Sequence, residues 1–313
     1  SGVFTLASPN SNTNRTLTFP DESGTLLTSL GGTTGNLTVS GNLSVDGGTI
    51  KLDGNYPVGT GNVALGDTAL DDGSLSGGYN TAIGSSALSD ATSGNSNIAV
   101  GYQALRYATT AAGNVSVGVN AMRDTLSGGS NIAVGQDALR SNTTASNNTA
   151  VGYQAGYANT TGAQNTALGR VSMLTNTTGN YNVSVGSVAL YYNTTGSNNV
   201  ALGTQALNNN TTASSNTAVG YQAGLSNTTG TYNTFVGKDA GFSNTTSSTN
   251  SFFGEYSGRS VTGESNTFYG QQSGHAITTG AKNTIIGRYT GNQGGLDIRT
   301  SSNNIVLSDG DGN

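Results

Sequence analysis

The sequence predicts an all-β protein, an elongated parallel β-solenoid or β-roll of about fourteen 17-residue coils. Three observations predict this fold class. Charged residues make up only 9% of the 313 residues and hydrophobic residues 33%, which leaves too few large apolar side chains for a thick globular core. Glycine, with 48 residues, has about twice its usual share. An asparagine followed four residues later by a glycine recurs along most of the chain at a near-constant spacing.

The repeat runs from Asn62 to Gly287 in fourteen copies, each beginning at an anchor asparagine and reaching an anchor glycine four residues later. Successive anchor asparagines are 17 residues apart, except for a first step of 18 (62 to 80) and one step of 16 (250 to 266). A period of this length is typical of solenoids, in which each coil buries its apolar side chains against its neighbours.

Each repeat predicts two short strands and two turns. Between the anchors lie three residues of high β-propensity, such as Ile98-Ala99-Val100, and these form the first strand. The segment after the glycine, such as Tyr102–Leu105, is expected to form the second. Glycine and asparagine at fixed positions supply positive φ angles or close backbone approach at the corners. The remainder is turn sequence of the Asn-Thr-Thr-Gly type.

Two positions of the repeat exchange sizes in a complementary way. The middle residue of the triplet is small where the residue six positions later is large, as in Ala99 with Leu105. Towards the end of the repeats the pair inverts, as in Phe235 with Gly241. Because close-packed interiors conserve volume, we expect the two positions to face each other across one core layer.

Two coils combine two small residues at these positions. They are the coils with the pairs Ala150/Gly156 and Ala218/Gly224. We expect the residues that follow the glycines directly, Tyr157 and Leu225, to fill the gaps.

The repeats, together with the resemblances described below for the segments on either side of them, divide the chain into four parts. Residues 1–30 predict an N-terminal β-module, and residues 31–57 a shaft-like connecting β segment. Residues 58–292 hold the repeats. Residues 293–313 form an exit segment that leads towards a C-terminal part beyond this sequence.

The repeats resemble those of a known family. Residues 148–155, Asn-Thr-Ala-Val-Gly-Tyr-Gln-Ala, are similar to the head repeats of trimeric autotransporter adhesins. Those heads are left-handed parallel β-rolls in which three chains pack around one axis. The resemblance covers about residues 58–292, and the unit here is longer, with an added Asn-Thr-Thr turn. It implies a homotrimer.

The flanking segments resemble bacteriophage tail fibres. Residues 4–9 and 15–27 look like a short β-module common in such fibres, and residues 36–47 look like fibre-shaft sequence. Residues 304–311 are similar to segments that precede an endosialidase-type intramolecular chaperone. The resemblance implies a structural fibre protein of a virion tail, in contact with other tail proteins and with a host-surface glycan or protein. The alternative of the same class is a trimeric adhesin head on a bacterial cell surface.

Three Tyr-Gln pairs directly follow an anchor glycine and are candidate receptor-binding residues. Tyrosine rings stack on sugars when they are exposed, and they serve equally well as contacts between neighbouring chains. The candidates are Tyr102, Gln103, Tyr153, Gln154, Tyr221 and Gln222.

Enzymatic, metal and cofactor chemistry finds little support, and we expect none. His275 is the only histidine and there is no cysteine, so neither a catalytic triad nor a zinc site is indicated. Asp239 and Glu255 lie one coil apart, but their offset predicts solvated neighbours and not a glycosidase pair. The ending Asp309-Gly310-Asp311 has the first ligand positions of a calcium loop, although a plain turn is expected.

Charge and hydropathy exclude two further classes. Only 11 lysines and arginines, in a chain of net charge −5, argue against nucleic-acid binding. The absence of a run of 18 apolar residues argues against membrane insertion.

Seven Asn-Thr-Thr corners, 17 residues apart, predict a side-chain ladder, although each also fits a glycosylation acceptor. A flat threonine ladder is also what ice-binding β-solenoids display, so ice binding is the alternative from another functional class. The asparagines of these corners are Asn142, Asn159, Asn176, Asn193, Asn210, Asn227 and Asn244.

Overall fold

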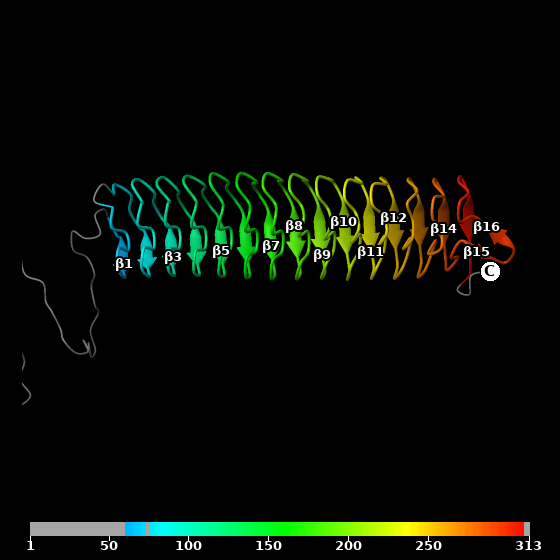
Figure 1. Cartoon of the computed structure of the whole chain (residues 1–313), viewed down its shortest axis with the longest axis horizontal. Helices are drawn as coiled ribbons and strands as arrows, with labels where there is room; N and C mark the ends of the chain where they lie inside the picture. The colour runs from blue at the N-terminus through cyan, green and yellow to red at the C-terminus, as the bar shows by residue number, and fades with distance from the viewer. Residues whose placement is uncertain (1–59, 73–74, 310–313) are drawn as a thin grey trace, which may run out of the picture. The chain divides into compact units, whose positions relative to one another are not determined.

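The structure is a computed structural model that describes residues 60–72 and 75–309, all within a compact unit formed by Lys51–Asn313. In this unit the coils stack in a single row, and each coil contributes one strand at the same place (Figure 1). Every regular element among the described residues is a strand. The expected N-terminal module (1–30), the connecting segment (31–57) and the end of the Asp-Gly-Asp turn lie outside the described residues.

One parallel sheet of fifteen strands joins the described coils. Its strands pair in chain order without crossovers, from β1 to β14 and then to β17. A small antiparallel hairpin, β15 with β16, separates β14 from β17, so the sheet extends past residue 292. The strands are β1 (Val63–Leu65), β2 (Thr81–Ile83), β3 (Ile98–Val100), β4 (Val115–Val117), β5 (Ile132–Val134), β6 (Thr149–Val151), β7 (Thr166–Leu168), β8 (Val183–Val185), β9 (Val200–Leu202), β10 (Thr217–Val219), β11 (Thr234–Val236), β12 (Ser251–Phe253), β13 (Thr267–Tyr269), β14 (Thr284–Ile286), β15 (Asn292–Gln293), β16 (Leu296–Asp297) and β17 (Ile305–Leu307).

The register places equivalent residues of successive coils directly against one another. Ala99 in β3, for example, lies opposite Ala82 in β2 and Ser116 in β4. Side chains with the same place in the repeat therefore form columns along the stack. We number these places from the anchor asparagine, position 0, so that the strand occupies positions 1–3 and the anchor glycine position 4. The predicted parallel solenoid of about fourteen 17-residue coils is thus confirmed.

The second strand of each coil does not form. In the segment after the anchor glycine, Gln103 has φ 54° and Leu105 has φ 52°, and the same two positions are left-handed in most coils. A strand requires negative φ, so the backbone here is a sequence of turns. Its amides are still paired between coils, because Gln103 N donates to Ser85 O and Leu105 N donates to Ala121 O, both at 3.0 Å. Stacking of the coils thus satisfies the hydrogen-bonding groups of a backbone segment that is not a β-strand.

The anchor glycines have the expected role, but the anchor asparagines do not. Gly152 has φ +135°, and a Cβ there would lie 2.5 Å from the carbonyl oxygen of Gly169 in the next coil. The anchor asparagines have no positive φ and instead form a buried ladder. Asn165 N donates to Asn148 Oδ1 at 2.9 Å, and Asn165 Nδ2 donates to Gly179 O at 2.8 Å. Their role is to satisfy polar groups inside the coil.

The predicted core pairing is confirmed. Ala99 and Leu105 are both fully buried, and a Cβ on Gly241 would collide with the ring of Phe235. Phe235 is also the first of three buried rings in successive coils, with centroids 5.6 Å and then 4.9 Å apart along the stack. The large residue of each pair therefore occupies the space that its small partner leaves.

The two exceptional coils are filled differently from the prediction. A Cβ on Gly156 would meet Leu139 Cδ2 at 2.9 Å, so the large residue of the preceding coil fills this gap. Tyr157, which was expected there, instead accepts a hydrogen bond from Arg140 through its hydroxyl and is only half-buried.

Gly224 shows the same arrangement with a neighbour on either side. A Cβ on Gly224 would meet Leu207 Cδ2 at 3.0 Å and Phe235 Cδ2 at 2.6 Å. Leu225, the residue expected to fill this space, is only half-buried. Large side chains of adjacent coils lean over the small pair, so packing is shared between layers.

Candidate functional site

The three Tyr-Gln pairs lie in the columns of positions 5 and 6. These columns form the side of the stack that each coil reaches directly after its anchor glycine. Tyr102, Tyr153 and Tyr221 are each about half exposed. The pairs are three and four coils apart, which corresponds to about 14 Å and about 19 Å at the ~4.8 Å spacing of strands. The structure therefore aligns the candidates along one side without bringing them into one site.

An open groove of about 510 Å³ lies on this side and includes the pair Tyr153/Gln154. It crosses the four coils that begin at Asn148, Asn165, Asn182 and Asn199. All of its residues come from positions 5, 6, 9 and 10 of these coils. They are Tyr153, Gln154, Arg170, Val171, Leu174, Val188, Tyr191, Tyr192, Gln205 and Asn208.

The groove exists because position 6 changes its residue type. Most coils carry a polar side chain there, as Gln154 and Gln205 do on either side. The two coils between them carry Val171 and Val188, whose side chains are shorter and apolar. These valines are buried and half-buried, respectively, so they form the floor of the groove.

Aromatic side chains border this floor. Tyr191 and Tyr192 occupy adjacent positions of one coil, and their ring centroids are 4.6 Å apart in an edge-to-face arrangement. Tyr192 is 49% exposed and Tyr153 is 44% exposed. The groove therefore combines an apolar floor with accessible tyrosine rings.

Hydrogen bonds fix the polar residues at one end of the groove. Asn208 Nδ2 donates to the carbonyl oxygen of Val188 at 2.8 Å, and Gln222 Nε2 donates to Gln205 Oε1 at 2.7 Å. Gln222, a candidate from the sequence, thus supports the groove without lining it.

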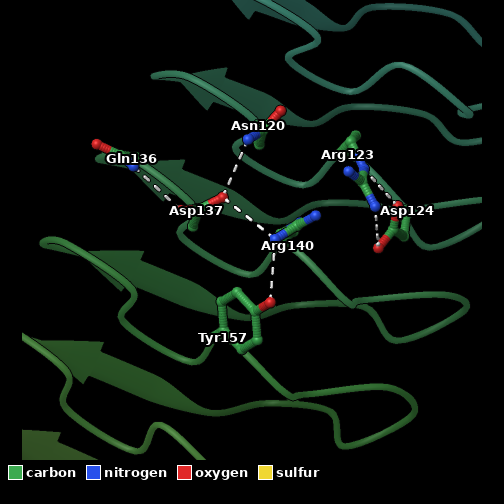
Figure 2. Close-up of polar contacts among 7 residues, drawn as sticks. All are labelled: Asn120, Arg123, Asp124, Gln136, Asp137, Arg140 and Tyr157. Atoms are coloured by element: carbon green, nitrogen blue, oxygen red, sulfur yellow. Dashed lines mark hydrogen bonds and ion pairs between the residues drawn. The ribbon is translucent and has the colours of Figure 1, made fainter.

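Charged residues in the coils that precede the groove neutralise one another, as Figure 2 shows. Arg123 pairs with Asp124 at 2.8 Å. Arg140 lies 3.8 Å from Asp137 and donates to the hydroxyl of Tyr157 at 3.0 Å. The guanidinium groups of this cluster are therefore occupied by neighbours on the same chain.

Arg170, on the edge of the groove, is in a different electrostatic setting. It is the only charged residue between Arg140 and Lys238 in the sequence. It is exposed, and it forms no ion pair with any described residue. Its positive charge is therefore uncompensated on an otherwise neutral part of the surface.

The outer face of the sheet carries a second notable surface, which we call the apolar column. It consists of the third residue of each strand in the parallel sheet. All of these residues are hydrophobic and none is buried in the single chain: eight are exposed and seven are partly exposed. Parallel sheets are normally covered on both faces, but the described residues of this chain cover only the inner face. The column comprises Leu65, Ile83, Val100, Val117, Val134, Val151, Leu168, Val185, Leu202, Val219, Val236, Phe253, Tyr269, Ile286 and Leu307.

The carboxylates considered from the sequence face separate cations. Glu255 Oε1 lies 3.4 Å from Lys238 Nζ, and Asp239 Oδ2 lies 3.8 Å from Arg259 Nε. The described residues contain no cluster of three or more metal-ligating side chains. His275 packs edge-on to a tyrosine ring, and burial, followed by the charge of Arg259, lowers its pKa below the ordinary 6.5.

The Asn-Thr-Thr corners form the predicted ladder. Asn176 is fully buried, and its Nδ2 donates to Asn159 Oδ1 at 2.8 Å and to Gly179 O at 3.0 Å. The first threonine is tied to the backbone as well, because Thr177 Oγ1 donates to Thr194 O at 3.0 Å. At six of the seven corners only the second threonine is exposed, and at the last corner Thr245 is exposed as well, so these corners display mainly a single threonine column.

Sequence reasoning missed Arg170 and the tyrosine pair of the groove. Two signals were present: a single charge in a long neutral stretch, and valines in a column that otherwise favours polar residues. Neither signal predicts a groove unless the columns are known to be adjacent.

No protein-family model, curated protein or solved structure matches this chain. The described residues include no helix of the length and apolar character needed to cross a membrane. Function is therefore inferred from the geometry of the chain and from the resemblances in its sequence.

Proposed function

We propose that the chain is a structural, non-enzymatic segment of a homotrimeric attachment fibre in a phage tail, outside the cell. In this role it positions or contacts a host-surface receptor, a glycan or a protein, and it joins other tail proteins. The apolar column carries the proposal. Contiguous apolar surface of this extent marks an interaction site in soluble proteins.

The partner that fits the column best is another copy of the chain. Fifteen strands at a spacing of ~4.8 Å make the column about 67 Å long. A partner must match that spacing over the whole length of the column. A second copy does so because it has the same sequence and therefore the same coil spacing. Because the column runs along one side of every described coil, three copies can bring their columns to one axis. The resemblance to trimeric adhesin heads supports the same number.

The test is the mass of the full chain in solution by light scattering, with far-ultraviolet circular dichroism on the same sample. A mass near three times 31.3 kDa with a β spectrum is the expected result. A β-rich monomer would contradict the trimer and favour the ice-binding alternative, which inhibition of ice recrystallisation then tests. Gold-labelled antibodies seen on virion tails, and not on bacterial cells, distinguish the tail fibre from an adhesin.

A further inference from the structure

The groove has the size and the kinds of side chain that a saccharide-binding site needs. Its volume of about 510 Å³ lies within the usual range for small-molecule sites, roughly 300–1,000 Å³. The valine floor and the exposed rings of Tyr153 and Tyr192 offer apolar surfaces to the faces of sugar rings. The amides of Gln154 and Gln205 supply hydrogen-bonding groups beside them.

The charge of the groove selects among saccharides. Arg170 is the only charged residue of its lining, and no carboxylate occurs between Asp137 and Asp239. A guanidinium group presents a planar array of donors that matches a carboxylate or a phosphate. Arg123 and Arg140, in the two coils before the groove, are already paired with acidic residues, whereas Arg170 is not.

We propose that this groove binds an acidic saccharide, with Arg170 holding the acid group and Tyr153 and Tyr192 stacking on sugar rings. This names the ligand class and the site for the attachment role proposed above, and it rests on that role. The lining residues occupy positions 5, 6, 9 and 10, and none belongs to the apolar column. Assembly and ligand binding can therefore be tested independently.

The experiment uses the full chain on an array of carboxylated, phosphorylated and neutral glycans, followed by calorimetric titration with the best acidic glycan. Binding to acidic glycans is expected. The carboxyl-reduced or dephosphorylated form of the same glycan identifies which acid group is recognised, because only the loss of that group abolishes binding.

Two variants and a matched control locate the site. Arg170→Gln and Tyr192→Ala should each weaken binding at least about tenfold, since each removes a direct contact. Tyr181→Ala should leave binding unchanged, because Tyr181 is equally exposed but lies outside the groove. All three residues are at the surface, so circular dichroism should be the same for every variant.

Three results would overturn the inference: no acidic glycan bound, binding of neutral glycans alone, or binding that is insensitive to both groove variants. Light scattering on the same samples separates this failure from failure of the fibre. A trimer without acidic-glycan binding leaves the fibre role standing. A monomer that binds acidic glycan through Arg170 leaves the groove standing.

Discussion

At the scale of single residues, the short distance between coils requires glycine at the anchor positions. Gly152 has a φ angle of +135°, and a Cβ at this residue would press on the carbonyl oxygen of Gly169. Gly294, in the hairpin, also has positive φ, but a Cβ there would meet nothing within 4 Å. The two glycines therefore differ in two respects: Gly152 combines a φ angle that only glycine favours with a collision, whereas Gly294 has a left-handed φ angle and open space.

Gly152→Ala is expected to destabilise the chain by about 3 kcal/mol or more, because the substitution combines a backbone region that only glycine favours with a clash against backbone. Gly294→Ala, the matched control, should cost only about 1–2 kcal/mol, the price of a left-handed alanine. Thermal and urea unfolding followed by circular dichroism measure both. Equal losses would show that neither the more restrictive φ angle nor the contact between coils adds a cost at Gly152.

A second residue-scale prediction concerns pH and the only histidine. Because burial and the charge of Arg259 lower the pKa of His275 in the folded chain below 6.5, protonation favours the unfolded state. The stability associated with neutral His275 is fully present above pH ~6.5 and is lost as the pH falls through the folded pKa. Melting temperatures between pH 7.5 and pH 5 should fall less steeply in His275→Gln than in the unmodified chain. The same slope in both would contradict this prediction.

At the scale of one coil, volume is conserved between the strand and the segment that faces it. Phe235 fills the space beside Gly241, where earlier coils place alanine against leucine. Leu207, at the position equivalent to Gly241, has φ 47°, so the backbone there already accommodates leucine.

Phe235→Ala should therefore cost about 3–5 kcal/mol through the cavity it leaves. Adding Gly241→Leu should recover most of that loss, although Gly241→Leu alone collides with Phe235 and destabilises the chain. The coupling is read from a double-mutant cycle of unfolding free energies. Pairing Phe235→Ala with Gly258→Leu, in the next coil, is the control and should give no recovery, since Gly258 faces Phe252.

At the scale of the whole stack, the apolar column should decide assembly. Replacing Val134 and Val151 with lysine puts two charges on the apolar column. The mass in solution should then fall from that of three chains towards that of one. Thr161→Lys, on the exposed threonine column, is the control and should leave the mass unchanged. If the lysine pair leaves the trimer intact, the interface lies on another side of the coil.

Much of the fold could be predicted because the information is local or strictly periodic. The 17-residue period defines the coils, and β-branched triplets such as Ile98-Ala99-Val100 define the strands. The exchange of Ala99/Leu105 for Phe235/Gly241 reveals the core pairing, since volume must be conserved within a layer. The seven asparagine corners predict their own ladder in the same way.

Only the tertiary structure decided the features that depend on contact between coils. Gln103 and Leu105 adopt positive φ because their amides bond to the preceding and the following coil, which propensity does not show. Leu139 fills the gap at Gly156 because neighbouring layers lie within reach of one side chain. The groove beside Arg170 arises where residues at least 17 positions apart in sequence are brought one coil apart in space. Sequence by itself determined the repeat and its layers, while stacking determined the surface, because stacking sets which columns are neighbours.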